Sequence, residues 1–195
     1  SPTEQTREVA AEAALAASAE RIREVLEDAI DDGRITVEKD LDQHHIVIRI
    51  EEKGSFPSGS AELTWEFEGL LLEMAKVLAD MPGKLTVEGH TDDIPIRTPR
   101  FYSNWDLSAA RSAAVANVLL ATGEVEPTRL AVKGLADTEP RVKNTSPGNR
   151  AKNRRVEIIV DLSGPQEEER LRLQELIDHN ANEREAIIDV RSATP

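Results

Sequence analysis

The stretch Gly89-His90-Thr91-Asp92-Asp93 follows a short apolar alternation, which indicates a strand that runs into a loop. A second stretch, Asn104-Trp105-Asp106-Leu107-Ser108-Ala109-Ala110-Arg111, opens an alanine-rich amphipathic segment and indicates a loop that leads into a helix. We therefore expect a carboxylate at a strand end and a guanidinium in the first turn of a helix. Such a pair can hold a small zwitterion from both ends, with Asp92 facing an ammonium and Arg111 holding a carboxylate.

The composition of the chain excludes several kinds of site and segment. The 195 residues suffice for one domain with additional segments, and 39% hydrophobic residues support a packed core. Cysteine is absent, so disulfides, thiol nucleophiles and thiolate zinc sites are excluded. No run approaches the roughly 20 apolar residues of a membrane span, and no signal peptide opens the chain. Because the chain begins at Ser1 without Met, we expect a fragment whose N-terminal context has been removed.

The net charge of −13 is unevenly distributed along the chain. Residues 1–83 carry 8 basic and 19 acidic side chains, whereas residues 84–162 carry 12 basic and 10 acidic ones. Residues 163–195 are again acidic, with 4 basic and 8 acidic side chains. The motif stretches thus lie in the one segment that is not acidic. No large basic stripe with interleaved aromatic residues is present, so nucleic acid is not an expected partner.

Apolar periodicity predicts strands and helices in alternation. Within residues 1–162, three helices are expected: one over residues 4–30, one from the N-cap Thr64 to about residue 80, and one over about 108–121. Strands are expected over residues 35–37, 46–50, 85–87, 130–132 and 156–162. Residues 136–151 are expected to be irregular. This order predicts an α/β (α+β) sandwich, β-α-β-α-β-β, with helices over one face of a small mixed sheet and helical extensions at both ends.

Three segments are expected along the chain. Residues 1–33 would form a partly disordered linker helix, residues 34–162 the binding domain, and residues 163–195 an amphipathic helix with a disordered tail. The linker is expected to rearrange when the protein is incorporated into its assembly.

The spaced motifs resemble those of the OmpA-like peptidoglycan-binding domain over roughly residues 45–162. The resemblance rests on Gly89-His90-Thr91-Asp92, Asn104-x-x-Leu107-Ser108-x-x-Arg111, Gly134-x5-Pro140-x3-Asn144 and Asn153-Arg154-Arg155-Val156-Glu157. In more detail, the local sequences at residues 59–63, 90–96 and 101–108 are similar to those in the periplasmic part of flagellar motor stator B subunits of the MotB or PomB type. In that branch the loop between Asp92 and Arg111 is longer than in plain OmpA porins.

The resemblance implies a site for the peptide stem of peptidoglycan, centred on meso-diaminopimelate. Asp92 and Arg111 would be the two principal ligands, with supporting roles for a further set of residues. That set comprises Thr91, Asn104, Leu107, Ser108 and Arg154. If Ser108 caps the helix, free N–H groups near Arg111 would add donors for the ligand carboxylate.

The resemblance also implies where the protein acts and with what. It implies a periplasmic domain of a single-pass inner-membrane protein whose transmembrane segment is missing here. Expected partners are peptidoglycan, a second copy in a homodimer, the stator A subunit through the missing segment, and flagellar periplasmic ring proteins. It implies no catalysis, no cofactor and no metal.

Other interpretations of the same residues stay open at this point. Asp92 could cap a turn, Asn104 could anchor a loop, and Arg154 could form a structural salt bridge. His90 is expected to pack or bond at the strand end, and Trp105 to be a core or lid aromatic rather than a sugar platform. A remote alternative is a metal-dependent hydrolase using His90, Asp92 and Asp93, for which no partner cluster of His or carboxylates is apparent. A non-motor envelope anchor of Pal or OmpA-porin type is the nearer alternative.

Overall fold

A computed structural model describes residues 3–164 and residue 177 of the chain. The predicted tail helix and the end of the chain lie outside the described residues, apart from Ile177. No helix in the described part of the chain is long and apolar enough to cross a membrane.

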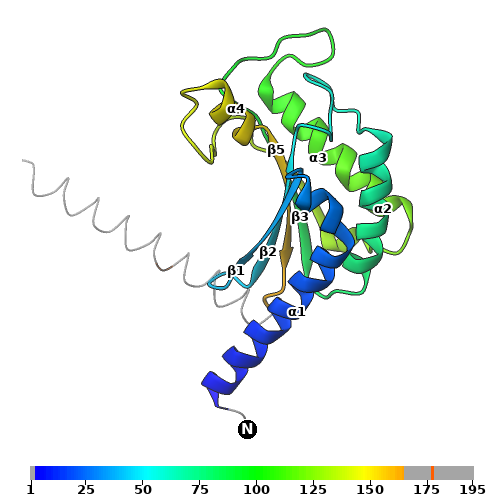
Figure 1. Ribbon diagram of the computed structural model, residues 1–195, viewed down its shortest axis with the longest axis vertical. Helices are drawn as coiled ribbons and strands as arrows, with labels where there is room; N and C mark the ends of the chain where they lie inside the picture. The colour runs from blue at the N-terminus through cyan, green and yellow to red at the C-terminus, as the bar shows by residue number, and fades with distance from the viewer. Residues whose placement is uncertain (1–2, 165–176, 178–195) are drawn as a thin grey trace, which may run out of the picture. The chain divides into compact units, whose positions relative to one another are not determined.

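The architecture is a mixed sheet whose one face is covered by the three longer helices (Figure 1). The strands are β1 Ile35–Asp40, β2 His45–Glu51, β3 Lys84–His90, β4 Leu130–Gly134 and β5 Arg155–Asp161, in the spatial order β1-β2-β5-β3-β4. Only β3 and β4 pair in parallel; the other neighbours are antiparallel. The helices are α1 Glu4–Asp31, α2 Trp65–Ala79, α3 Asn104–Ala121 and α4 Pro147–Asn153, with a 3-10 turn η1 Pro127–Arg129. The predicted fold class is confirmed.

Alternation along the strands builds the core. Val156, Ile158 and Val160 of β5 are at most 1% exposed and face the helices, whereas Glu157 lies on the opposite face of the sheet. Leu71 of α2 and Val115 of α3 cover this apolar face, and both are fully buried. The opposite face of the sheet is occupied by charged side chains instead.

The N-terminal helix contributes to the same core. Leu15, Ile22 and Leu26 are at most 1% exposed and fall on one stripe of α1. The helix ends where predicted, with Gly33 in a left-handed conformation (φ 72°) after it. The division at residue 33 into linker and domain stays a prediction, as does the expected rearrangement of this helix.

Two predicted boundaries were wrong. Helix α3 begins at Asn104, because Ser103 and Asp106 form a reciprocal capping box one turn earlier than Ser108. Arg111 therefore lies two turns inside the helix, where no free backbone N–H groups remain. The stretch 136–151 is also not wholly irregular, since Ser146 accepts a hydrogen bond from the Asn149 N–H and starts α4.

Helix α3 lies directly against the backbone of two strands. A Cβ at Gly89 would overlap the carbonyl oxygen of Ser108, and one at Gly134 would overlap the backbone of Ala109. The hydroxyl of Ser112 donates to the Lys133 carbonyl at 2.7 Å across this contact. These glycines therefore set the distance between α3 and the end of β3 that carries Asp92.

We expect Gly89→Ala to lower the free energy of unfolding by about 1–3 kcal/mol, because the added methyl forces α3 away from β3. Urea unfolding measures this effect. Gly69→Ala on the exposed side of α2 is the matched control, since nothing lies within 4 Å of the new Cβ. The control should be neutral or stabilising by up to about 1 kcal/mol. An unfolding midpoint for Gly89→Ala equal to that of the native chain would contradict the close-packing argument.

Candidate functional site

Four charged side chains meet at one end of the sheet. Asp92 follows β3, Arg111 comes from α3, Glu52 follows β2, and Arg154 lies between α4 and β5. Strands β2 and β3 both neighbour β5, so the ends of β2 and β3 and the start of β5 reach the same edge of the molecule. Three of the four sequence motifs are thus brought together, with Glu52 as an additional member.

The four groups alternate in charge along one continuous network. Arg154 donates from Nη1 to Asp92 Oδ2 at 2.7 Å and from Nε to Glu52 Oε1 at 3.0 Å. Arg111 donates from Nη1 to Glu52 Oε2 at 2.6 Å. Asp92 and Arg111 therefore belong to one network, but Arg154 and Glu52 stand between them.

Arg111 is the most deeply buried member of the network. Its side chain is 1% exposed, and its Nε donates to the Ser60 carbonyl at 2.7 Å. The guanidinium carbon lies 5.0 Å from the ring centroid of Phe56. A buried guanidinium is tolerated only when it is paired and hydrogen-bonded, and Glu52 with the loop carbonyls provides this. Its three described hydrogen bonds go to Ser60, Glu52 and Pro57, and its side chain is buried, so direct contact between Arg111 and a ligand requires the surrounding groups to move.

Asp92 and Arg154 form the more accessible half of the network. The Arg154 side chain is 32% exposed, against 8% for Asp92 and 13% for Glu52. Burial would lower the pKa of Arg154, but its hydrogen bonds to Asp92 and Glu52 outweigh burial and raise it. Asp92 also accepts the Ile94 N–H at 3.0 Å through Oδ1, so it caps the turn as well as pairing with Arg154.

The remaining predicted site residues hold the loop that follows Asp92. Asn104 donates to the carbonyls of Asp92 and Ile94 and accepts the Ile96 N–H at 3.2 Å. Thr91 donates to the Asp92 carbonyl at 2.8 Å. The amide of Asn104 is thus engaged with the loop backbone, as expected for a loop anchor.

Ser108 and Leu107 act from inside the helix. The Ser108 hydroxyl is fully buried, donates to the Trp105 carbonyl and accepts the Ala136 N–H at 3.1 Å. Leu107 packs in a small apolar cluster with Ala61 and Phe101. The geometry gives both residues a positioning role, and ligand contact by either stays a prediction.

Exposed aromatic residues surround the start of α3. Trp105 is 53% exposed and Tyr102 is 76% exposed, so the expected core position of Trp105 was wrong. The first turn of the helix points this ring outward, while the core side is taken by Leu107. A lid or a sugar-stacking role for Trp105 stays a prediction.

The loop after β3 does not assemble the metal site of the remote alternative. Asp93 pairs with Arg150 at 2.9 Å, Asp92 pairs with Arg154, and His90 is turned to the open face of the sheet. The expectation that His90 has no partner cluster was also wrong, because Glu88 and Glu157 lie beside it. A signal was present in the sequence, since Glu88 and His90 are two apart on a strand and share a face.

The open face of the sheet carries its own charge network. Glu157 Oε1 accepts from Arg155 Nε at 2.6 Å and from Arg49 Nε at 3.0 Å. Burial would raise the pKa of Glu157, but these two guanidinium groups outweigh it and lower that pKa. The neighbouring His90 lowers the pKa of Glu88 to about 2, against the opposing effect of burial and together with Lys133. Both glutamates are therefore carboxylates at neutral pH.

Sequence reasoning missed Glu52. It stands at the end of an apolar strand before a loop rich in Gly, Ser and Pro, where acidic residues are common and carry no motif. Its role depends on two arginines that are 59 and 102 residues away in the chain. Only the fold brings these partners together.

The chain is similar to several known proteins. Motility protein B of Bacillus subtilis (strain 168) is 28% identical over 144 residues, which cover 72% of this chain and 55% of that protein. The solved cell wall anchor of the T6SS from Pseudomonas aeruginosa is 41% identical with a TM-score of 0.66, covering 73% of this chain and 97% of that one. A periplasmic domain of Helicobacter pylori MotB is 26% identical with a TM-score of 0.60, covering 75% and 91% of the two chains.

The fold and the charged network define a small α/β domain with a polar site at one end of its sheet. Residues 55–154, which are 100 of the 195 residues, match the OmpA family, and the chain belongs to that family. The chain spans about half the length of the curated relatives it matches.

We expect Glu52→Gln to lower the free energy of unfolding by about 2 kcal/mol or more, because it removes the carboxylate that neutralises buried Arg111. Urea unfolding at neutral pH measures the change. Glu62→Gln is the matched control, since Glu62 pairs with Arg100 on the surface at 2.9 Å, and it should change stability by less than about 1 kcal/mol. Equal effects of the two substitutions would show that Arg111 does not depend on Glu52.

Proposed function

We propose that this chain binds peptidoglycan without cleaving it and so anchors a larger assembly to the cell wall. The observation that carries the proposal is the Asp92–Arg154–Glu52–Arg111 network at the site where the OmpA motifs converge. Carboxylate and guanidinium groups are both held there in fixed positions, so the site can pair with an ammonium and with a carboxylate. Membership of the OmpA family and similarity to a cell wall anchor support the same activity.

The proposed ligand is the diaminopimelate residue of the peptide stem. Its free end carries an ammonium and a carboxylate on one carbon, which match Asp92 and Arg154. On binding, the ligand replaces one internal ion pair with two intermolecular pairs, so the total charge around Asp92 and Arg154 stays balanced. Arg111 holds Glu52 in place beside Arg154, and contacts the ligand carboxylate if Glu52 gives way. Thr91, Asn104, Leu107 and Ser108 set the loop and helix that frame the site.

We expect Asp92→Asn and Arg154→Gln each to weaken binding to purified sacculi by about tenfold or more, since each removes one charge-assisted pair. Co-sedimentation with sacculi measures the bound fraction at increasing protein concentration. Arg111→Lys should also weaken binding, because an ammonium cannot hold Glu52, Ser60 and Pro57 together. Asp93→Asn is the matched control and should bind like the native chain, as Asp93 pairs only with Arg150 among the described contacts. Equal binding by all variants would contradict the assignment of the binding site to these residues.

The same assay tests the ligand. Sacculi whose stems carry lysine in place of diaminopimelate lack the second carboxylate. Arg154 would then have no ligand carboxylate with which to pair. Their binding should fall to the level of Asp92→Asn or Arg154→Gln, and those two substitutions should cause little further loss. Undiminished binding to lysine-type sacculi would contradict recognition of diaminopimelate.

We further propose that the anchored assembly is an ion-driven flagellar stator and that the chain is the periplasmic part of its B subunit, acting as a homodimer. Similarity to Motility protein B supports this assignment. In that role, the stator A subunit is held through a membrane segment outside this chain, and flagellar periplasmic ring proteins are further candidate partners. Wall binding would let the stator resist the torque of the rotor.

A non-motor anchor is the second candidate. The T6SS cell wall anchor has 41% identity to this chain, which exceeds the 28% identity of Motility protein B from Bacillus subtilis. The wall-binding activity would be the same in both cases, and the attached machine would differ. Asp92 and Arg154 would keep their roles.

Chromosomal Asp92→Asn separates the two candidates. If the chain serves a stator, cells should lose swimming while they still assemble flagella, because an unanchored stator transmits no torque. Swim diameter and electron microscopy of flagella provide the two readouts, with Asp93→Asn as control. Normal swimming by a strain whose protein no longer binds sacculi would eliminate the motor role and leave the non-motor anchor.

A further inference from the structure

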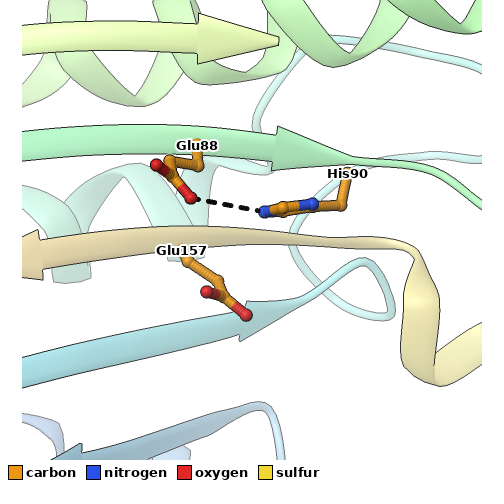
Figure 2. A group of neighbouring side chains, drawn as sticks. All are labelled: Glu88, His90 and Glu157. Atoms are coloured by element: carbon orange, nitrogen blue, oxygen red, sulfur yellow. Dashed lines mark ion pairs between the residues drawn. The ribbon is translucent and has the colours of Figure 1, made fainter. Parts of the chain in front are cut away.

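A second constellation of ligating side chains lies on the open face of the sheet, outside the proposed peptidoglycan site. Glu88 and His90 stand two apart on β3 and therefore share a face. Glu157 of β5 is the direct cross-strand partner of Glu88 in the antiparallel register. Figure 2 shows the Glu88 carboxylate and the His90 ring facing each other along β3, with Glu157 beside them on β5.

The three side chains are buried and close together. Their exposed fractions are 8% for Glu88, 2% for His90 and 9% for Glu157. One ligating atom from each lies within 4.8 Å of the others. The distance from His90 Nε2 to Glu88 Oε2 is 3.8 Å, which is too long for a hydrogen bond.

His90 forms no hydrogen bond in the described structure, and its one described polar contact is the ion pair with Glu88 at 3.8 Å. Neither Nδ1 nor Nε2 has a hydrogen-bond partner, although the ring is almost completely buried. Leaving a buried polar group unpaired costs roughly 1–3 kcal/mol. Two carboxylates placed directly opposite one another on a sheet also repel. A cation between Glu88, His90 and Glu157 would relieve both costs at once.

We propose that Glu88, His90 and Glu157 bind a divalent transition-metal ion of the Zn²⁺ class. An imidazole with two carboxylates is a donor set suited to Zn²⁺, whereas Mg²⁺ and Ca²⁺ prefer oxygen ligands alone. Ligand atoms about 2.0–2.2 Å from a tetrahedral zinc lie about 3.4 Å from one another. The Glu88–His90 spacing is near this value, and small rotations of the glutamate side chains bring in the third ligand. Water completes the coordination.

The surrounding cations orient the carboxylates and also limit the affinity. Lys133 holds Glu88 Oε1 at 3.0 Å, and Arg49 and Arg155 hold Glu157 Oε1. These bonds leave Glu88 Oε2 facing His90, and Oε2 of Glu157 receives none of the hydrogen bonds described. Positive neighbours repel a metal ion, while the carboxylate of Glu38 offsets Arg49. Such neighbours act as outer-shell partners that fix ligand orientation.

A metal here would brace the strand end that carries the binding loop. His90 is the last residue of β3, and Thr91 and Asp92 follow it directly. The ion would tie this end of β3 to β5 through side chains, in addition to the backbone ladder between Gly89 and Val156. Its role is structural, on the face of the sheet opposite the helices.

The test is zinc binding by the purified chain after dialysis against a chelator. Isothermal titration with ZnCl₂ should show one ion per chain, and zinc should raise the melting temperature. His90→Gln and Glu88→Gln should each weaken zinc binding by more than roughly a hundredfold, which is the upper end of the loss that follows removal of an outer-shell partner. His45→Gln is the matched control, since His45 pairs with Asp161 at 3.5 Å at the other end of β2. This control should bind zinc like the native chain.

Several outcomes would overturn the proposal. Zinc binding that is absent from the native chain, or equal in all the variants, would mean that these side chains hold no specific ion. A His90 ring whose NMR signals follow pH but not zinc would identify a proton, in an imidazolium–Glu88 pair, as the occupant. Should His90→Gln fail to fold, the nearly isosteric Glu88→Gln carries the test, and its unchanged affinity would equally refute the site.

Discussion

The carboxylate of Glu52 lies between two guanidinium groups, and the arrangement of the proposed binding site depends on that position. Arg111 is almost fully buried and needs a negative partner, while Arg154 pairs with both Glu52 and Asp92. One carboxylate serves both, through its two oxygens at 2.6 and 3.0 Å. Because each charge in the chain of four neutralises the next, removing one leaves another uncompensated in a region of low dielectric.

This network is held by a rigid frame of backbone contacts. Helix α3 approaches β3 and β4 so closely that only glycine fits at 89 and 134. The buried hydroxyls of Ser108 and Ser112 then join the helix to the chain at Ala136 and Lys133. A site built on such a frame keeps its charged groups at fixed separations before a ligand arrives, which reduces the entropy lost on binding.

The two faces of the sheet serve different purposes. One face is apolar and packs beneath α1, α2 and α3, so it provides the stability of the domain. The other carries charged side chains that are nevertheless buried by one another, including Arg49, Glu88 and Glu157. Alternation along β3 and β5 produces both faces from the same residues. The candidate metal site and the candidate wall-binding site thus share strands but not side chains.

The sequence by itself determined the fold class and the family, and it indicated that Asp92, Arg111 and Arg154 belong to one site, because apolar periodicity and motif spacing are local properties of a chain. It also predicted the left-handed end of α1 at Gly33. It misplaced the start of α3, since a capping box at Ser103 and Asp106 competed with Ser108 and its reciprocal bonds were not recognised. What only the tertiary structure decided is pairing across distance: Glu52 with Arg111 and Arg154, and Glu157 with Glu88 and His90. These contacts follow from strand order and register, which depend on how the whole chain buries its apolar surface and leave no local trace in the sequence.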